Sequence, residues 1–142
     1  MEGELTRLDH LGIAVRSLSQ GTAFWTQGLG LEVEAVEEIA GERVRAAFIP
    51  VGPCRVELLE ASAPDSVIAR FVEKRGEGLH HVCFAVDDLD AALARLRACG
   101  YRLIGAAPRP GAEGSQVAFV HPGSAGGVLI ELKQVRETVD KS

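Results

Sequence analysis

The sequence has few of the features that would place the protein in a membrane, outside the cell or on nucleic acid. No apolar run approaches the roughly 20 residues that a transmembrane helix needs, and the first residues are acidic rather than apolar or Arg-rich. We therefore expect no membrane partner, no secretory signal and no transit peptide. The basic residues are scattered and the net charge is −5, which argues against non-specific binding to nucleic acid.

Cysteine is scarce and gives no sign of a disulfide framework. The three cysteines, Cys54, Cys83 and Cys99, are odd in number and show no CxxC spacing. Reduced thiols in a cytoplasmic protein are therefore expected. With 142 residues, 46% of them hydrophobic, the chain is long and apolar enough to form one compact domain around a working core.

The chain does contain an internal repeat. Three segments of the first half return in the second half, two of them at an offset of 71 residues and the third at a slightly larger one. The pairs are 8–15 with 79–86, 47–52 with 118–123, and 56–59 with 130–133. Each copy opens with a histidine and closes with a glutamate, both on expected strands. The sequence therefore predicts two copies of one structural unit.

Hydrophobic alternation and capping residues give both copies the same order of elements, βαβββ. In the first copy we expect strand 10–15, helix 17–29 and strands 32–38, 43–50 and 55–60. In the second copy we expect strand 81–86, a helix capped at 87 or 88 and closed by Gly100, and strands 102–106, 116–120 and 128–133. Another capped helix is expected at 66–74, in the segment that joins the copies.

These elements predict an α+β fold in a single domain that spans residues 1–142. Module one covers 8–60, a linker with its own helix covers 61–78, and module two covers 79–134. Two half-domains that share one core are the arrangement expected of such a repeat.

The first strand of each copy places its histidine beside small side chains. His10 shares a face of its strand with Gly12 and Ala14, which leaves room above the strand for a ligand. His81 shares the face of its own strand with Cys83. The alternation therefore predicts two histidines whose surroundings can accept a bound group.

Two histidines and two glutamates occupy equivalent places in the two copies, His10 and Glu57 in the first and His81 and Glu131 in the second. Any one of them alone is better explained as a strand histidine with ordinary hydrogen-bond partners or as a glutamate exposed to solvent. Each glutamate, however, lies in an apolar strand, where an unpaired carboxylate would be costly to bury. Imidazole and carboxylate groups bind divalent cations, and this set admits cobalt, manganese, nickel or zinc. We therefore predict a divalent metal site formed by these four residues.

Three other features are weaker. His80 points to the face opposite His81 and is either a group that supports the site or a packed imidazole. The segment 109–114 has the glycine content of a phosphate-contacting loop, a pattern that is common in ordinary turns. His121 precedes Pro122 at a strand end and is expected to be a turn residue.

The chain resembles the vicinal-oxygen-chelate superfamily and, within it, the methylmalonyl-CoA epimerases, over residues 8–134. The similar segments are 9–15, 48–52, 56–60, 64–69, 74–81, 108–112 and 121–132. The resemblance implies two paired βαβββ modules that form a curved mixed sheet around a metal site. It also implies a homodimer and favours cobalt as the metal.

The resemblance can be carried over position by position. It places the family's metal ligands at His10, His81 and Glu131. The remaining ligand position, which is Gln in some members, falls on Glu57. A glutamate proposed as a second acid or base in some members falls on Ala46, which cannot take that role.

The implied activity is epimerisation of a CoA thioester at C2, which interconverts (R)- and (S)-methylmalonyl-CoA. Glu131 is the expected acid or base at C2, and the metal would stabilise the enolate that forms when the proton leaves. Glu57 is either the fourth ligand or the proton-transfer partner on the opposite face of the substrate.

Two other functions are found on the same fold. A lyase like glyoxalase I, acting on a lactoylglutathione-type substrate, shares the His/Glu ligand set, although residues 121–123 depart from the turn typical of glyoxalases. A non-catalytic protein that binds a drug or an antibiotic is the other alternative. Such binders often lack the full ligand set, which this chain keeps.

Overall fold

The computed structural model describes residues 3–111 and 114–135 of the chain. Contacts between residues divide the chain into two compact units. The first unit is Asp9–His81, and the second combines the residues up to Leu8 with those from Val82 onward. The expected single domain, with its module boundaries, stays a prediction.

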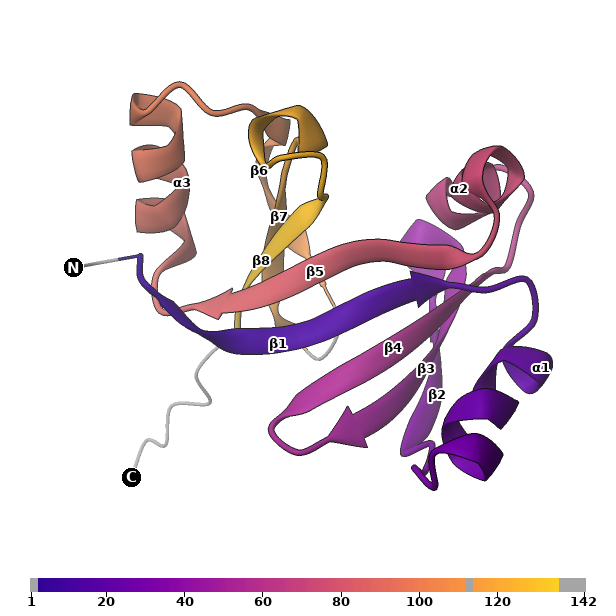
Figure 1. The fold of residues 1–142 in the computed structure, drawn as a ribbon. Helices are drawn as coiled ribbons and strands as arrows, with labels where there is room; N and C mark the ends of the chain where they lie inside the picture. The colour runs from indigo at the N-terminus through magenta and orange to yellow at the C-terminus, as the bar shows by residue number, and fades with distance from the viewer. Residues whose placement is uncertain (1–2, 112–113, 136–142) are drawn as a thin grey trace. The chain divides into compact units, whose positions relative to one another are not determined.

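The first unit is built on a mixed sheet. Its strands are β1 (Leu5–Ala14), β2 (Ala35–Ile39), β3 (Val44–Val51) and β4 (Cys54–Ala61), which lie in the order β2-β3-β4-β1 (Figure 1). The β1–β4 pair is parallel, and the β2–β3 and β3–β4 pairs are antiparallel. The register opposes Glu57 to Gly12 on β1 and to Phe48 on β3, so these three positions share one face of the sheet.

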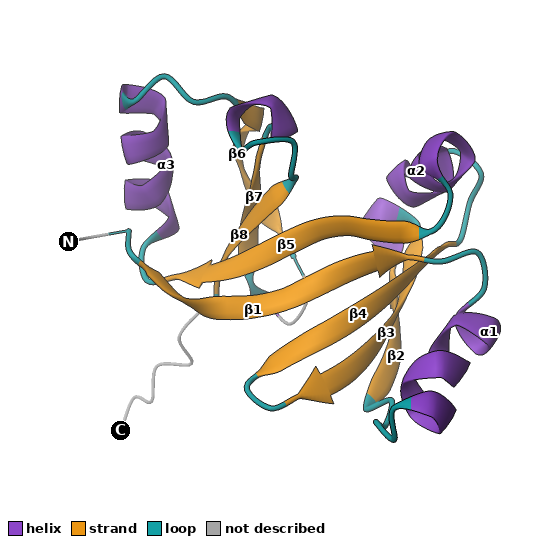
Figure 2. Ribbon diagram, in the orientation of Figure 1, coloured by secondary structure: helices purple, strands orange, loops and turns teal. Residues whose placement is uncertain are grey.

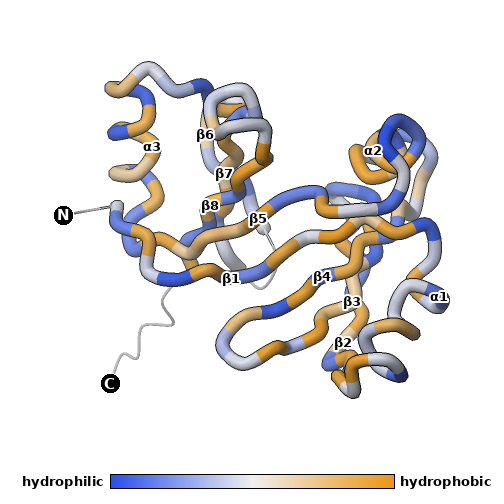
Figure 3. Tube along the Cα trace, viewed as in Figure 1, coloured by the Kyte–Doolittle hydropathy of each residue, from blue (hydrophilic) through white to orange (hydrophobic). Residues whose placement is uncertain are grey.

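Both faces of the first sheet are apolar, and each is covered by a helix. Helix α2 (Val67–Arg75) packs Ile68 into a cluster on the face that carries Glu57. Helix α1 (Leu18–Ala23) packs Leu18 into a second cluster on the opposite face. Most of the cluster residues come from β3 and β4, which are predominantly apolar along their length (Figure 3). The histidine-bearing face of the first sheet is therefore largely a core face.

The second unit repeats this arrangement. Its elements are β5 (Gly78–Val86), α3 (Leu89–Ala98), β6 (Leu103–Pro110), β7 (Gln116–Val120) and β8 (Ile130–Gln134), with the strands in the order β5-β8-β7-β6 (Figure 2). The division between the units falls within two strands, so residues 78–81 of β5 belong to the first unit and residues 5–8 of β1 to the second. The β5–β8 pair is parallel and the other two pairs are antiparallel. Helix α3 packs Leu89 and Leu93 against residues of β7 and β8. The predicted βαβββ order is confirmed in both copies.

The structure differs from the expected elements at several boundaries; β1, for example, begins at Leu5 and β2 at Ala35. The helix expected at 17–29 is α-helical only to Ala23 and continues as a π-helical turn, η1 (Phe24–Gly28), in which the Leu29 amide donates to the Phe24 carbonyl at 3.0 Å. Strand β8 begins at Ile130, because Gly126 and Gly127 before it have φ of 70° and 93° and form a turn. Strand β6 extends as far as Pro110.

The N-terminus of α2 depends on a single side chain. Ser66 is 3% exposed, and its hydroxyl accepts a hydrogen bond from the Ala69 amide at 3.0 Å. We expect Ser66→Ala to lower the free energy of unfolding by about 1 kcal/mol, because the amide loses its acceptor. Urea unfolding measures this change, and Ser19→Ala, at an exposed position of α1, is the control. An equal effect of both substitutions would contradict the capping role.

Within the described ranges, no helix is both long and apolar enough to cross a membrane.

Candidate metal site

Two buried imidazoles face one another in the first unit. The Nε2 atoms of His10 and His81 lie 3.1 Å apart, and the two rings are nearly perpendicular, at 86°. The two residues are only 4% and 7% exposed. The structure thus brings together the two histidines that the repeat singled out.

This spacing fits a shared metal ion. Suppose that two imidazole nitrogens bind the same ion at about 2.1 Å each and that the two bonds meet at a right angle. The nitrogens then lie about 3.0 Å apart. The observed separation is 3.1 Å. Both nitrogens could therefore bind the same ion with little movement of either ring, and the donor set suits a divalent transition metal.

Gly12 provides the space that the His81 ring occupies. A Cβ atom at position 12 would overlap that ring, with Nδ1 2.5 Å and Nε2 2.6 Å away. The expectation of open room for a ligand above Gly12 and Ala14 is therefore wrong. The imidazole fills the space over Gly12, and Ala14 is 0% exposed within the α2-side core cluster.

The other nitrogen of His10 is oriented by carboxylates. Its Nδ1 lies 2.8 Å from Asp9 Oδ2 and 3.2 Å from Glu57 Oε2. Because ionised carboxylate oxygens only accept, Nδ1 carries a proton, and in the neutral ring the lone pair is then on Nε2, the nitrogen that faces His81. A carboxylate on the far nitrogen is the usual support of a metal-binding histidine.

Glu57 also lies in this cluster, held by an arginine. Its Oε2 accepts a hydrogen bond from Arg55 Nη2 at 3.0 Å, and the Arg55 guanidinium stacks over the Phe48 ring at 4.7 Å. Glu57 is 6% exposed. The carboxylate is thus buried with both charge and hydrogen-bond partners, and its role as a metal ligand stays a prediction.

Asp9 and Arg55 are site residues that sequence reasoning missed. Arg55 could have been found, because it stands two positions before Glu57 and therefore shares its face of β4. Asp9 could not be found from alternation, because that rule sends the side chain next to His10 to the opposite side of the strand. Its carboxylate instead reaches the His10 ring.

Glu131 occupies the equivalent position in the second unit. It lies on β8 opposite Cys83 of β5, just as Glu57 lies on β4 opposite Gly12 of β1. In both strand pairs the glutamate faces the residue two positions after the histidine. Glu131 is 9% exposed. The repeat therefore extends to the register of the strands, while the catalytic and ligand roles of Glu131 stay predictions.

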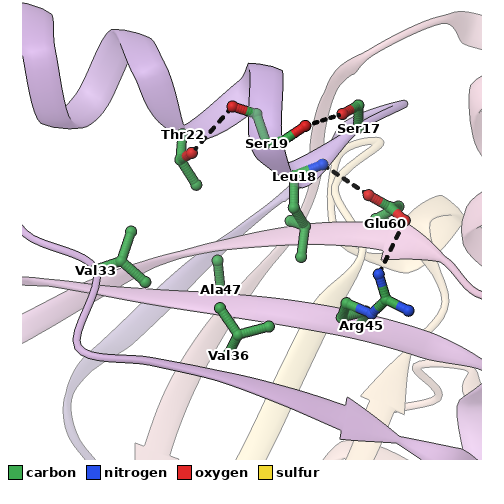
Figure 4. Close-up of a pocket in the computed structure, with 9 residues that line it drawn as sticks. All are labelled: Ser17, Leu18, Ser19, Thr22, Val33, Val36, Arg45, Ala47 and Glu60. Atoms are coloured by element: carbon green, nitrogen blue, oxygen red, sulfur yellow. Dashed lines mark hydrogen bonds and ion pairs between the residues drawn. The ribbon is translucent and has the colours of Figure 1, made fainter.

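A groove in the first unit lies on the opposite face of the sheet. The residues that line it are Ser17, Leu18, Ser19, Thr22, Val33, Val36, Arg45, Ala47 and Glu60 (Figure 4). Glu60 accepts from the Leu18 amide at 2.7 Å and pairs with Arg45 at 3.7 Å. The polar groups of the groove thus support the start of α1, and we assign no chemistry to them.

The segment 109–114, whose glycine content is that of a phosphate-contacting loop, begins as the end of strand β6 at Arg109 and Pro110. Arg109 pairs with Val117 and Pro110 with Gln116, and the Arg109 guanidinium stacks over the Phe119 ring at 5.3 Å. Residues 112–113 lie outside the described residues. His121 begins the short helical turn that follows β7, and its Nδ1 accepts from the Gly123 amide at 2.9 Å. The prediction of a turn residue there is confirmed.

Comparison with known proteins gives consistent matches. Residues 9–119 match the family described as the Glyoxalase/Bleomycin resistance protein/Dioxygenase superfamily. The ethylmalonyl-CoA/methylmalonyl-CoA epimerase of Cereibacter sphaeroides is 40% identical over 131 residues, which cover 91% of this chain and 98% of that protein. The mitochondrial methylmalonyl-CoA epimerase of Homo sapiens is 37% identical over 131 residues, which cover 92% of this chain and 74% of that protein.

A solved structure extends the similarity to three dimensions. It is the Streptomyces coelicolor methylmalonyl-CoA epimerase in complex with 2-nitronate-propionyl-CoA. The similarity has a TM-score of 0.88 at 36% identity and covers 94% of this chain and 100% of that chain. The matches thus agree with one another in sequence and in fold.

Proposed function

This chain belongs to the glyoxalase/bleomycin resistance protein/dioxygenase superfamily and, within it, to the methylmalonyl-CoA epimerases, and we propose that it interconverts (R)- and (S)-methylmalonyl-CoA. The predicted α+β fold of two βαβββ modules is confirmed. The observation that carries the proposal is the pair of buried imidazoles, with Nε2 atoms 3.1 Å apart. The epimerases of Cereibacter sphaeroides and Homo sapiens, which match about nine-tenths of this chain, support it.

One divalent metal ion would be held by His10 and His81, with Glu57 and Glu131 as the further ligands. Imidazole and carboxylate donors support this proposal, as does the use of divalent metals in the superfamily. We propose cobalt as the metal, with manganese, nickel and zinc as ions that the same donors accept. When bound, the ion supplies positive charge that a thioester oxygen and a carboxylate oxygen of the substrate can share.

Glu131 would act as the acid or base on one face of C2. That carbon lies between a thioester and a carboxylate, so the anion left by the proton is planar and delocalised. The nitronate ligand of the Streptomyces coelicolor enzyme is also a planar, delocalised anion, which supports this route. Ala46 has no titratable group and is 0% exposed, so it takes no proton. Glu57, a buried carboxylate, is either the fourth ligand of the ion or the proton-transfer partner on the opposite face.

We propose a homodimer in the cytoplasm as the working form. The dimer follows from the family resemblance. The free state of Cys54, Cys83 and Cys99 supports a reducing compartment. Sedimentation of the purified protein tests the oligomeric state.

Deuterium exchange at C2 tests the proposed reaction. Metal-loaded protein is incubated with methylmalonyl-CoA in D₂O, and loss of the C2 proton signal is followed by NMR. We expect exchange with the wild type and its loss in His81→Ala, because one of the two imidazole ligands is removed. His121→Ala, a substitution at the turn after β7, is the control.

Two outcomes contradict the proposal in different ways. Exchange that survives in a folded His81→Ala variant would exclude a reaction that depends on this metal site. A wild type that holds metal but exchanges nothing would not be an epimerase. In that case, turnover of the glutathione hemithioacetal of methylglyoxal would identify a lyase like glyoxalase I.

A further inference from the structure

We infer that His80 is a positioning residue of the metal site, which holds the His81 ring and sets which of its nitrogens faces the ion. The inference rests on the proposed function, because His10 and His81 must bind a metal for it to matter. His80 Nδ1 lies 2.9 Å from His81 Nδ1, on the side of the ring away from His10. One of the two nitrogens must donate to the other at this distance.

The His80 ring is fixed on its other side by helix α2. It packs edge-on against Phe71, with the ring centroids 5.0 Å apart and the planes at 84°. It meets the His81 ring at 88° with a centroid separation of 5.2 Å. His80 is half-buried, and its ring is held between the His81 ring and Phe71. The expectation that it points away from His81 holds for the backbone of β5 but not for the ring nitrogen.

Three hydrogen bonds link Asp9, His10, His81 and His80 into one chain within the first unit. Asp9 accepts from His10 Nδ1 at 2.8 Å, and when the His10 ring is neutral its lone pair is on Nε2. Without an ion, His81 Nε2 must therefore donate to His10, and its own Nδ1 must accept from His80 Nδ1. Each imidazole is then neutral and carries one proton, and the direction of donation is the same at every step.

If His10 and His81 hold a metal ion, the hydrogen bond between His80 and His81 would run in the opposite direction. His81 Nε2 must then offer a lone pair, so its proton leaves to solvent. The His80 Nδ1 proton crosses to His81 Nδ1, and His80 takes a proton from solvent on Nε2. One proton leaves, one enters, and every imidazole stays neutral. His80 can thus serve as donor to the empty site and as acceptor to the filled one.

Two substitutions separate this role from simple packing. His80→Phe keeps an aromatic ring against Phe71 but removes the hydrogen bond to His81. His80→Asn restores a polar atom close to the place of Nδ1 that can donate or accept. We expect His80→Phe to bind Co²⁺ roughly 10- to 100-fold more weakly than the wild type, the usual loss for a supporting group of a metal ligand. We expect His80→Asn to recover most of that affinity.

Calorimetric titration with Co²⁺ measures the affinity, and the visible absorption of bound cobalt reports its coordination. His121→Phe is the control. Wild-type affinity and an unchanged cobalt spectrum in His80→Phe would overturn the inference while leaving the proposed function intact. A wild type that binds no Co²⁺ would overturn the proposed metal site, and this inference with it.

A measurement on the wild type covers the case in which His80→Phe does not fold. Long-range ¹⁵N–¹H NMR assigns the tautomer of each histidine in the apo protein and with Zn²⁺ bound. We expect the His80 proton on Nδ1 in the apo protein and on Nε2 in the zinc-bound protein. The same His80 tautomer in both states would contradict the proposed role.

Discussion

Exchange of the C2 proton is expected to fall by roughly 10²- to 10⁴-fold when Glu131 is replaced by Gln, the usual contribution of a general acid or base. The amide keeps the shape and an oxygen donor of the carboxylate, but it cannot take up the proton. The rate of deuterium incorporation from D₂O into methylmalonyl-CoA measures the effect. Glu73→Gln, at an exposed position of α2, makes the same chemical change as a control.

Metal content separates the two roles proposed for Glu131. If the variant keeps one ion per chain and loses exchange, the carboxylate acts on the proton. If the variant loses the ion as well, the carboxylate is a ligand of the metal. The exchange rates of the variant and the wild type are then compared at saturating Co²⁺. Wild-type exchange in a metal-loaded Glu131→Gln variant would exclude Glu131 as the acid or base and would shift that role to Glu57.

Gly12→Ala is expected to weaken Co²⁺ binding by at least about 100-fold, beyond the range seen when only a supporting group is lost. The added Cβ would lie 2.5 Å from His81 Nδ1 and 2.6 Å from Nε2, so the ring must leave its place over β1. His81 Nε2 then no longer faces His10 Nε2. The crowding is also expected to lower the free energy of unfolding by about 1–3 kcal/mol. Calorimetric titration and urea unfolding measure the two effects.

Gly41→Ala is the matched control for this substitution. A Cβ at position 41 meets nothing within 4 Å, and Gly41 is not among the residues with positive φ. Alanine there is therefore expected to leave metal binding unchanged and stability equal or slightly higher. If Gly12→Ala kept wild-type affinity for Co²⁺, His81 would have to bind metal from a position other than the one over Gly12.

The elements and the ligand candidates were predictable because strands and helices have fixed periods. Alternation along residues 10–15 and 81–86 placed His10 and His81 on defined faces of their strands, and the repeat paired them with Glu57 and Glu131. Alternation follows from the geometry of a strand, and the repeat is visible in the sequence, so a single sequence is enough to detect both. The two copies therefore gave the βαβββ order and the histidine pair directly.

The surroundings of the site were less predictable, because alternation fixes the face of a side chain and not its torsion angles. The Asp9 carboxylate turns back to the neighbouring His10 ring, and the His80 ring turns toward His81. The small residue at position 12 was interpreted as room for a ligand, whereas it is room for an imidazole. The identity of the occupant depends on a contact between residues 69 positions apart, which no local pattern contains.

The two-residue turn between β3 and β4 has a consequence for how this site can change. Val51 pairs with Cys54 across Gly52 and Pro53, and Gly52 has a φ of 59°, as the first central residue of a tight hairpin turn does. The turn fixes the register of β4 against β3, and therefore which side chains of β4 lie on the face that carries His10. Lengthening the turn by one residue and shifting β4 accordingly would exchange the sides of Glu57 and Leu58. The carboxylate would then enter the apolar cluster under α1. The length of this turn is thus constrained although no residue of the proposed site lies in it. We expect few insertions or deletions at Gly52 and Pro53 among homologues.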